Sequence, residues 1–159
     1  MKKLRFFVVT LSLLSAFVWL AQAPVQAQSV TRHEETDTAI AYSPGIWIPE
    51  TTMPWSGGRA LYAVFSPNTP GQATFTFTGT GVDWIGYRGR YGGVVLVRLD
   101  GDLPTVLDTY SGTEQVSVVV YSARGLAPGI HSLTIDLTGA RNPLATNSET
   151  VVDAFDVTH

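Results

Sequence analysis

Residues 76–101, T-F-T-G-T-G-V-D-W-I-G-Y-R-G-R-Y-G-G-V-V-L-V-R-L-D-G, constrain the fold of this chain more than any other stretch. β-Branched and aromatic residues occur there in short runs, separated by glycines and closed by the Asp100-Gly101 dipeptide. Because such residues end a strand and permit a tight reversal, the pattern is typical of an antiparallel all-β domain.

The same strand pattern continues through residues 39–159. Phe75 and Phe77 share one face of a predicted strand, and threonines occupy the other face. Further strands are predicted at 40–48 (bent by a Ser-Pro-Gly turn), 59–65, 82–87, 94–99, 103–110, 115–121, 131–137 and 151–157. No segment shows a helical period, so two packed antiparallel sheets are predicted. We expect an all-β sandwich of the jelly-roll type; an immunoglobulin-like sandwich is the alternative, which periodicity does not separate.

Residues 1–27 have the features of a cleaved secretory signal peptide. Lys2, Lys3 and Arg5 precede an apolar run from Phe6 to Ala21, and small residues follow at Val25 to Ala27. A retained membrane anchor is the alternative, but about sixteen apolar residues are short against the roughly twenty of a bilayer span. We therefore expect a secreted, extracytoplasmic protein, in the periplasm or on the cell surface, with no membrane insertion after cleavage.

Residues 28–38 are polar and aperiodic, which predicts an N-terminal tail or a first short edge strand before a single β-sandwich domain at 39–159. Without residues 1–27, the chain keeps 7 arginines against 13 acidic residues, a formal net charge of −6. An acidic domain lacks the positive field that nucleic acid requires, so nucleic acid is not an expected partner. The absence of cysteine excludes disulfides.

Several short motifs resemble those of the galactose-binding-like jelly-roll domains. These are Y-S-P-G-I-W at 42–47, F-T-F-T-G-T-G-V-D-W-I-G at 75–86, V-R-L-D-G at 97–101, G-L-A-P-G-I-H-S-L-T-I at 125–135 and V-D-A-F-D-V at 152–157. Such domains accompany many secreted bacterial enzymes and surface proteins as carbohydrate-binding modules. The resemblance implies a jelly-roll fold and a binding role without catalytic activity, here without a catalytic neighbour.

The sequence offers no catalytic constellation. His33, His131 and His159 lack metal-ligand spacing, and no Gly-x-Ser-x-Gly turn is present for a serine hydrolase. We predict that His131 hydrogen-bonds backbone at its turn. Asp100 and Asp102 flank a glycine and are explained by turn chemistry. We therefore predict that the protein is not an enzyme, with a small hydrolase as a distant third hypothesis.

Asp153 is the unusual carboxylate, because it shares strand parity with Phe155 and Val157. If those residues point inward, Asp153 is buried and needs partners. One hypothesis is a structural calcium site of Asp153 with a carboxylate from the start of the domain, Asp37 or Glu35, and backbone carbonyls. The alternatives are that Asp153 accepts hydrogen bonds from backbone amides or an arginine, or that Val152 and Ala154 point inward instead.

Aromatic and arginine side chains in glycine-rich loops suggest a ligand site. Trp84 lies mid-strand and is predicted to be core, whereas Trp55 and Tyr91 lie in loops. An exposed aromatic ring stacks on the apolar face of a sugar, and Arg88 and Arg90 would supply hydrogen-bond donors. The alternative is that residues 88–93 form an ordinary solvated loop.

The leading functional hypothesis is a secreted, non-catalytic module that recognises carbohydrate or cell-envelope glycan. The alternative is a structural or adhesive envelope protein without a small ligand, whose partner is a surface protein. A contiguous exposed apolar patch or self-association would favour that alternative.

Overall fold

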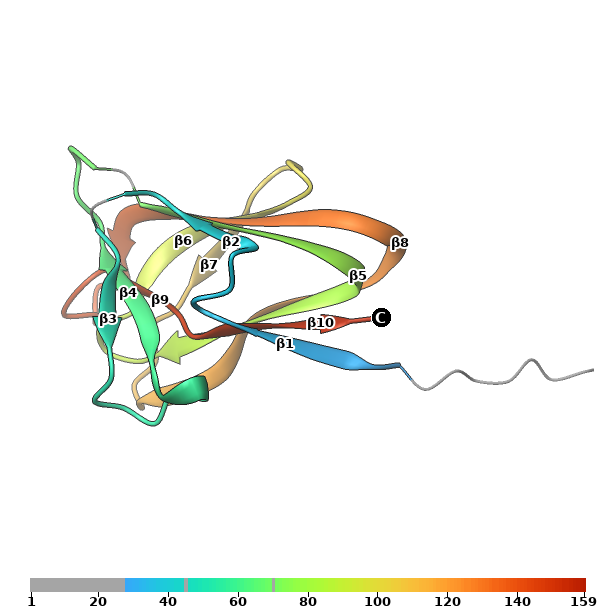
Figure 1. The fold of residues 1–159 in the computed structure, drawn as a ribbon. Coiled ribbons are helices and arrows are strands. Elements are labelled where there is room, and N and C mark those ends of the chain that lie inside the picture. Colours follow the sequence, from blue (N-terminus) through green and yellow to red (C-terminus); the bar gives the residue numbers. More distant parts are fainter. Residues whose placement is uncertain (1–27, 45, 70) are drawn as a thin grey trace, which may run out of the picture.

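We describe the chain from a computed structural model covering residues 28–44, 46–69 and 71–159. The predicted signal peptide, residues 1–27, lies outside these described residues. Their regular structure consists of strands and one short 3-10 turn (Figure 1): β1 (Val30–Glu34), β2 (Ile40–Tyr42), β3 (Ile48–Glu50), η1 (Ser56–Gly58), β4 (Ala60–Val64), β5 (Gln72–Arg88), β6 (Gly93–Leu99), β7 (Thr105–Asp108), β8 (Gln115–Arg141), β9 (Glu149–Val152) and β10 (Ala154–Thr158). Within these ranges, no helix has the length and apolar character needed to span a bilayer.

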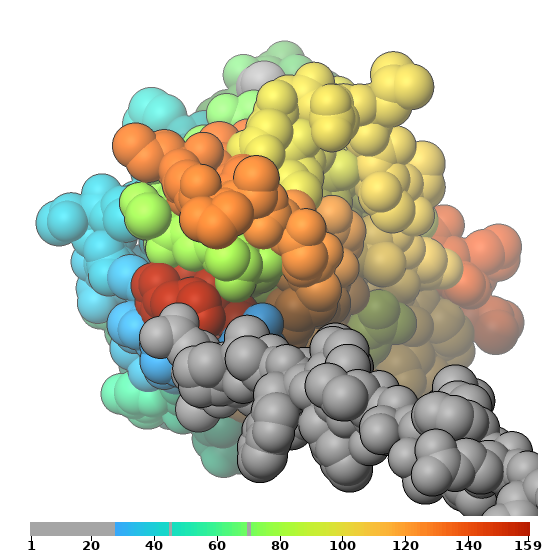
Figure 2. All heavy atoms as spheres, turned by 90° about the vertical axis from the view of Figure 1, so that its right-hand side faces the viewer, coloured from blue at the N-terminus to red at the C-terminus, as the bar shows by residue number. Residues whose placement is uncertain are grey.

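The strands form an antiparallel β-sandwich, as the sequence predicts. The larger sheet runs β1-β10-β5-β8-β6-β7, with β2 also paired to β5, and the smaller sheet runs β3-β4-β9. Every pairing between these strands is antiparallel. Figure 2 shows β1, β10, β5 and β8 side by side at one end of the molecule, in blue, red, green and orange.

Two long strands of the larger sheet, β5 and β8, bend together at one end (Figure 1), so that the two halves of this sheet form two layers around the main core. At the bend, Gly79 pairs with Gly129 and Gly81 pairs with Arg124, so β8 carries extra residues that form its outer curve. A Cβ atom on Gly79 would lie 2.6 Å from the backbone oxygen of Thr158, so only glycine fits there. Bends of this kind let one strand serve both layers.

The main core lies between the layers. Phe75 stacks on Phe77 of the same strand and on Phe155 of β10, with ring centroids 5.4 and 4.5 Å apart. All three rings are buried, which confirms the predicted inward face of residues 75 and 77. Trp84 is also core, as predicted, and its Nε1 donates to the Val151 carbonyl at 3.1 Å. That bond satisfies the polar atom of a buried indole.

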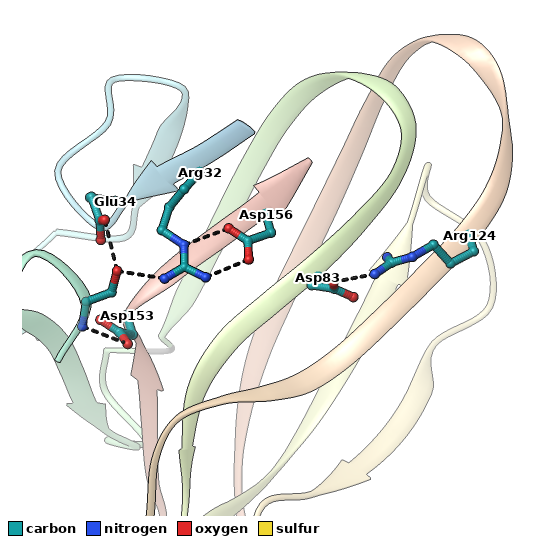
Figure 3. A network of polar contacts seen from close by, with 7 residues as sticks. Arg32, Glu34, Asp83, Arg124, Asp153 and Asp156 are labelled. Carbon is teal, nitrogen blue, oxygen red and sulfur yellow. Dashed lines mark hydrogen bonds and ion pairs between the residues drawn. The ribbon is translucent and has the colours of Figure 1, made fainter. Parts of the chain in front are cut away.

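Of the two alternatives for residues 28–38, the structure shows an edge strand. β1 pairs with β10 from Val30 opposite Thr158 to Glu34 opposite Ala154. Arg32 donates from Nε and Nη2 to the two oxygens of Asp156 at 2.7 and 2.6 Å (Figure 3). The strand carries few apolar residues because it lies at the sheet edge, so its sequence lacks the alternation that identifies the inner strands.

Strand boundaries differ from the sequence prediction in the second half of the chain. The strands predicted at 115–121 and 131–137 are parts of the single strand β8, because the Gly125–Gly129 turn bends the ladder without ending it. The predicted common face of Val116, Val118 and Val120 is also wrong. Register shifts opposite Trp84–Ile85 and Gly86–Tyr87 interrupt the alternation.

Candidate ligand-binding site

A pocket of about 290 Å³ lies at the end of the sandwich opposite the β5–β8 bend, beside the small sheet β3-β4-β9. β3, β4, β9, the end of β5 and the loops after β3 and β5 all contribute side chains. The lining residues are Pro49, Glu50, Met53, Trp55, Tyr62, Tyr87, Tyr91, Glu149 and Val151. The volume is close to the lower end of the range of about 300–1,000 Å³ for small-molecule sites.

The wall of the pocket is a second apolar cluster, separate from the main core. Trp55, Ala60, Tyr87 and Val151 form its buried part. Met53, Tyr62, Tyr91 and Val116 pack against it and are partly buried. The partly buried aromatic rings at the pocket surface are the groups on which a sugar ring can stack.

Trp55 is buried, contrary to the expectation of an exposed loop aromatic. Its side chain is 6% exposed, and Nε1 donates to Glu50 Oε2 at 3.1 Å. The sequence places Trp55 in a glycine-rich loop, but the turn η1 that follows it folds the ring onto β4 and β9. Trp55 therefore lines the pocket as part of a fixed wall.

Two carboxylates lie in this aromatic pocket. Glu50 accepts from the backbone N and Oγ1 of Thr52, each at 2.7 Å, as well as from Trp55. Burial opposes the ionisation of Glu50, but these hydrogen bonds hold its pKa below the ordinary value. Glu149 differs, because burial raises its pKa and the charges of Glu114 and Glu50 act in the same direction, against a bond from Asn147.

The loop between β5 and β6 is held in place by the backbone. The amides of Thr146 and Glu149 donate to the carbonyls of Arg90 and Tyr91, each at 2.8 Å. A Cβ atom on Gly92 would lie 2.3 Å from the Thr109 carbonyl, so this position requires glycine. The loop that carries Tyr91 is thus tied to β9, which carries Glu149.

The predicted ligand residues divide into two groups. Tyr91 joins Trp55 in the pocket lining. Arg90 lies at the rim, with its guanidinium 4.7 Å from the centre of the Tyr91 ring and its Nε 3.3 Å from Glu114 Oε1. Arg88 is directed elsewhere, because its Nη2 donates to the Val120 carbonyl at 3.1 Å. Arg88 is therefore not brought together with the other three.

Sequence reasoning missed several residues of the pocket, namely Glu50, Met53, Tyr62, Glu149 and Val151. They come from separate strands and loops that meet only through the pairing of β3, β4 and β9. No local spacing marks them as a group. The one usable signal was the density of aromatic residues in the loops around Trp55 and Tyr91.

Asp153 is fully buried where the chain passes from β9 to β10. Its Oδ2 accepts from the Ser56 amide at 3.3 Å, whereas its Oδ1 is buried and has no hydrogen-bond partner among the residues that the structure describes. Burial raises the pKa of this carboxyl group. Figure 3 shows the neighbouring Glu34, whose Oε1 accepts from Ser56 Oγ at 2.9 Å and whose Oε2 is also buried with no partner within the same described residues.

The other two predicted calcium ligands have protein partners. Glu35 accepts from Arg59 Nε at 2.6 Å, and Asp37 accepts from the Ala39 amide at 2.9 Å and faces His33 Nδ1 at 2.8 Å. In the part of the chain that the structure describes, no three acidic or histidine side chains are grouped as a metal site. Of the three predicted ligands, only Asp153 has a buried carboxylate oxygen without a partner in this part of the chain. One such oxygen does not form a calcium site, so calcium binding stays a prediction.

His131 is a structural residue, as predicted. Its Nε2 lies 2.8 Å from the Ala127 carbonyl in the β8 bend, and its Nδ1 lies 2.7 Å from Asp100 Oδ2. The hydrogen bond with Asp100 raises the pKa of His131. The ring therefore joins the bend of β8 to the turn after β6.

The fold places the chain among antiparallel β-sandwich domains, and comparisons with known proteins agree. No protein-family model matches the chain. The A type blood alpha-D-galactosamine galactosaminidase of Flavonifractor plautii is 30% identical over 105 residues, covering 66% of this chain. This chain corresponds to only 9% of that protein.

Two solved structures share the fold. A two-domain esterase active on acetylated mannans has a TM-score of 0.62 at 12% identity, covering 82% of this chain and 36% of the esterase chain. A Paenibacillus xanthan lyase has a TM-score of 0.57 at 16% identity, covering 78% of this chain and 12% of the lyase. At these identities the likeness shows the fold alone.

Proposed function

We propose that this chain is a non-catalytic carbohydrate-binding domain and that the pocket beside β3, β4 and β9 is its ligand site. The observation that carries the proposal is the combination of partly buried aromatic rings, Tyr62 and Tyr91, with the carboxylates of Glu50 and Glu149 around one cavity. A sugar has apolar ring faces and a rim of hydroxyl donors, and these surfaces match such a lining.

The comparisons support a carbohydrate-related role. The names of the similar proteins refer to A type blood alpha-D-galactosamine, acetylated mannans and xanthan. In each case this chain matches only a fraction of the larger protein, as expected for an accessory domain. We extend the proposal to a secreted protein whose partner is a glycan.

The absence of catalysis is part of the proposal and is supported by the fixed orientation of Glu50, by the structural role of His131 and by the lack of a serine-hydrolase turn. Glu50 accepts three hydrogen bonds from Thr52 and Trp55, which holds it ionised and fixed. His131 is bonded to the Ala127 carbonyl in the β8 bend and to Asp100, and it does not line the pocket. The sequence contains no Gly-x-Ser-x-Gly turn of the kind that carries a serine-hydrolase nucleophile.

The test is a glycan-array screen of the purified protein, followed by calorimetric titration of the best ligand. We expect Tyr62→Ala and Tyr91→Ala each to weaken binding by about fivefold, because a stacked ring contributes about 1 kcal/mol. Tyr110→Ala, outside the pocket, is the matched control and should bind like the wild type. Unchanged affinity in both pocket variants would place the site elsewhere, and hydrolysis of the bound glycan would overturn the non-catalytic assignment.

A further inference from the structure

We infer that the pocket selects a sugar bearing a free amine, a hexosamine in its ammonium form, over neutral, N-acetylated and acidic sugars. This inference rests on the proposed function and adds the ligand class. It is carried by the charge and chemistry of the groups around one cavity.

The lining of the pocket is acidic and aromatic. Among the residues that the structure describes, it includes Glu50 and Glu149 and no lysine, arginine or histidine. A protonated amine is attracted both by a carboxylate and by the face of an aromatic ring, and cages of this composition recognise ammonium ligands. A uronic acid would meet two like charges in the same space, which disfavours its binding.

Glu149 is the carboxylate with capacity to bind the amine. Its Oε1 accepts from Asn147 Nδ2 at 2.8 Å, while Oε2 accepts no hydrogen bond from the residues that the structure describes. The side chain is half-buried, and the neighbouring charges of Glu114 and Glu50 disfavour its ionisation. A bound cation would offset both effects, whereas a neutral hydroxyl group would offset them only weakly.

Glu50 contributes a fixed negative charge to the pocket. Its oxygens are occupied by Thr52 and Trp55, so it is fixed in orientation against the indole. A fixed negative charge beside a binding site raises the local concentration of cations and needs no rearrangement when the ligand arrives. Glu50 is therefore a positioning and electrostatic residue, and Glu149 is the direct partner of the amine.

Arg90 is the positive side chain at the rim, and its charge is already paired. It lies between the Tyr91 ring, 4.7 Å from the guanidinium carbon, and Glu114, 3.3 Å from Nε. Arg90 is 62% exposed, so it is directed largely toward solvent. Its position shows that an aromatic ring and a carboxylate at this end of the domain already hold one cation together.

The inference is tested by calorimetric titration with glucosamine and galactosamine against glucose, galactose, their N-acetylated amines and glucuronic acid. At a pH where the amine is protonated, we expect at least one free amine to bind about tenfold or more tightly than its N-acetylated and neutral counterparts. Added salt should weaken the binding of the amine and leave that of the neutral sugar nearly unchanged.

Variants identify the group responsible. Glu149→Gln keeps the size and the hydrogen bond to Asn147, and it should remove most of the preference for the amine while retaining neutral-sugar binding. Asp102→Asn, an exposed carboxylate in the turn after β6, is the matched control and should keep the preference. The salt dependence of the wild type tests the same point without a substitution.

The outcomes separate the two proposals. If neutral sugars bind in a manner that Tyr62→Ala weakens, but the amine gives no gain or Glu149→Gln keeps the gain, the ammonium inference is overturned and the carbohydrate site stands. Tighter binding of glucuronic acid than of the amines would overturn it as well. If no sugar of any class binds, the proposed function itself falls, and the ammonium inference falls with it.

Discussion

Single residues in this protein show how strongly a side chain's surroundings decide its role. Asp153 and Asp156 lie three positions apart, yet Asp156 binds Arg32 at the surface, while Asp153 is fully buried and one of its oxygens has no partner in the described part of the chain. Ionisation of a buried carboxyl group costs free energy when the group lacks a full set of hydrogen-bond partners. Asp153 therefore carries the most direct test of calcium at this junction.

We predict that calcium raises the melting temperature of the wild-type protein and that Asp153→Asn abolishes this rise. A ligand that binds only the folded state adds about 2.7 kcal/mol at a hundredfold excess over its dissociation constant. Thermal unfolding with calcium and with a chelator measures the effect. Identical wild-type curves under the two conditions would show that Asp153 is a core carboxylate without a metal.

The pH dependence of the same variant provides a second measurement without calcium. Burial raises the folded-state pKa of Asp153 above its unfolded value of about 3.9. Its stabilising contribution is therefore present below the unfolded pKa and is lost as the pH rises through the folded pKa. In chelator, Asp153→Asn should melt higher than the wild type at neutral pH, and this advantage should disappear in acid.

Arg88 and Arg90 are two residues apart, and the structure predicts that replacing them by alanine changes the stability of the fold by different amounts. Arg88→Ala should lower the free energy of unfolding by about 1 kcal/mol, because Nη2 bonds the Val120 carbonyl at the β8 bulge. It should leave glycan affinity unchanged. Arg90→Ala, at the exposed rim, should shift stability by less than about 0.5 kcal/mol. Denaturant unfolding and titration of both variants decide; a loss of affinity in Arg88→Ala at full stability would restore its predicted ligand role.

At the scale of elements, the sequence predicts what alternation can encode. The inward face of Phe75 and Phe77 and the burial of Trp84 follow from local patterns, and both are confirmed. Extra residues in β8 opposite Gly79–Gly81 and at two further register shifts have no such signature. A bulge depends on the partner strand, so periodicity within one strand does not reveal it.

The bend of β5 predicts a large difference between two glycines that are paired in the ladder. Gly79→Ala should destabilise the fold by about 1–3 kcal/mol, because the added methyl group would meet the Thr158 backbone and Val157, each at 2.6 Å. Gly129→Ala, opposite it, meets nothing within 4 Å and should be close to neutral. Urea unfolding of the two variants compares their free energies of unfolding. A loss for Gly79→Ala as small as that for Gly129→Ala would show that the bend tolerates a side chain.

At the scale of the whole molecule, the pocket exists because three distant segments meet. Glu50, Tyr91 and Glu149 come from β3, the β5–β6 loop and β9, and strand pairing together with the Tyr91–Glu149 backbone bond assembles them. The sequence indicated the loop aromatics Trp55 and Tyr91 but not these carboxylates. The sequence also left residues 28–38 open between a tail and an edge strand before a domain at 39–159, for a related reason, since an edge strand such as β1 pairs mainly through its backbone.

The role of β1 leads to a prediction for shortened chains. A chain that begins at Gln28 should fold with the full sandwich, whereas one that begins at Ala39 should be several kcal/mol less stable. The shorter chain loses the β1–β10 ladder, at about 1 kcal/mol per hydrogen bond, and the Arg32–Asp156 ion pair.

Removal of residues 28–38 also leaves Arg59 without its buried partner Glu35 and exposes the edge of β10. Urea unfolding followed by circular dichroism compares the two chains, both of which should show an all-β spectrum if folded. Equal midpoints would mean that residues 28–38 act as the polar tail that their composition suggests. A lower midpoint together with self-association of the shorter chain would identify β1 as the strand that protects the sheet edge.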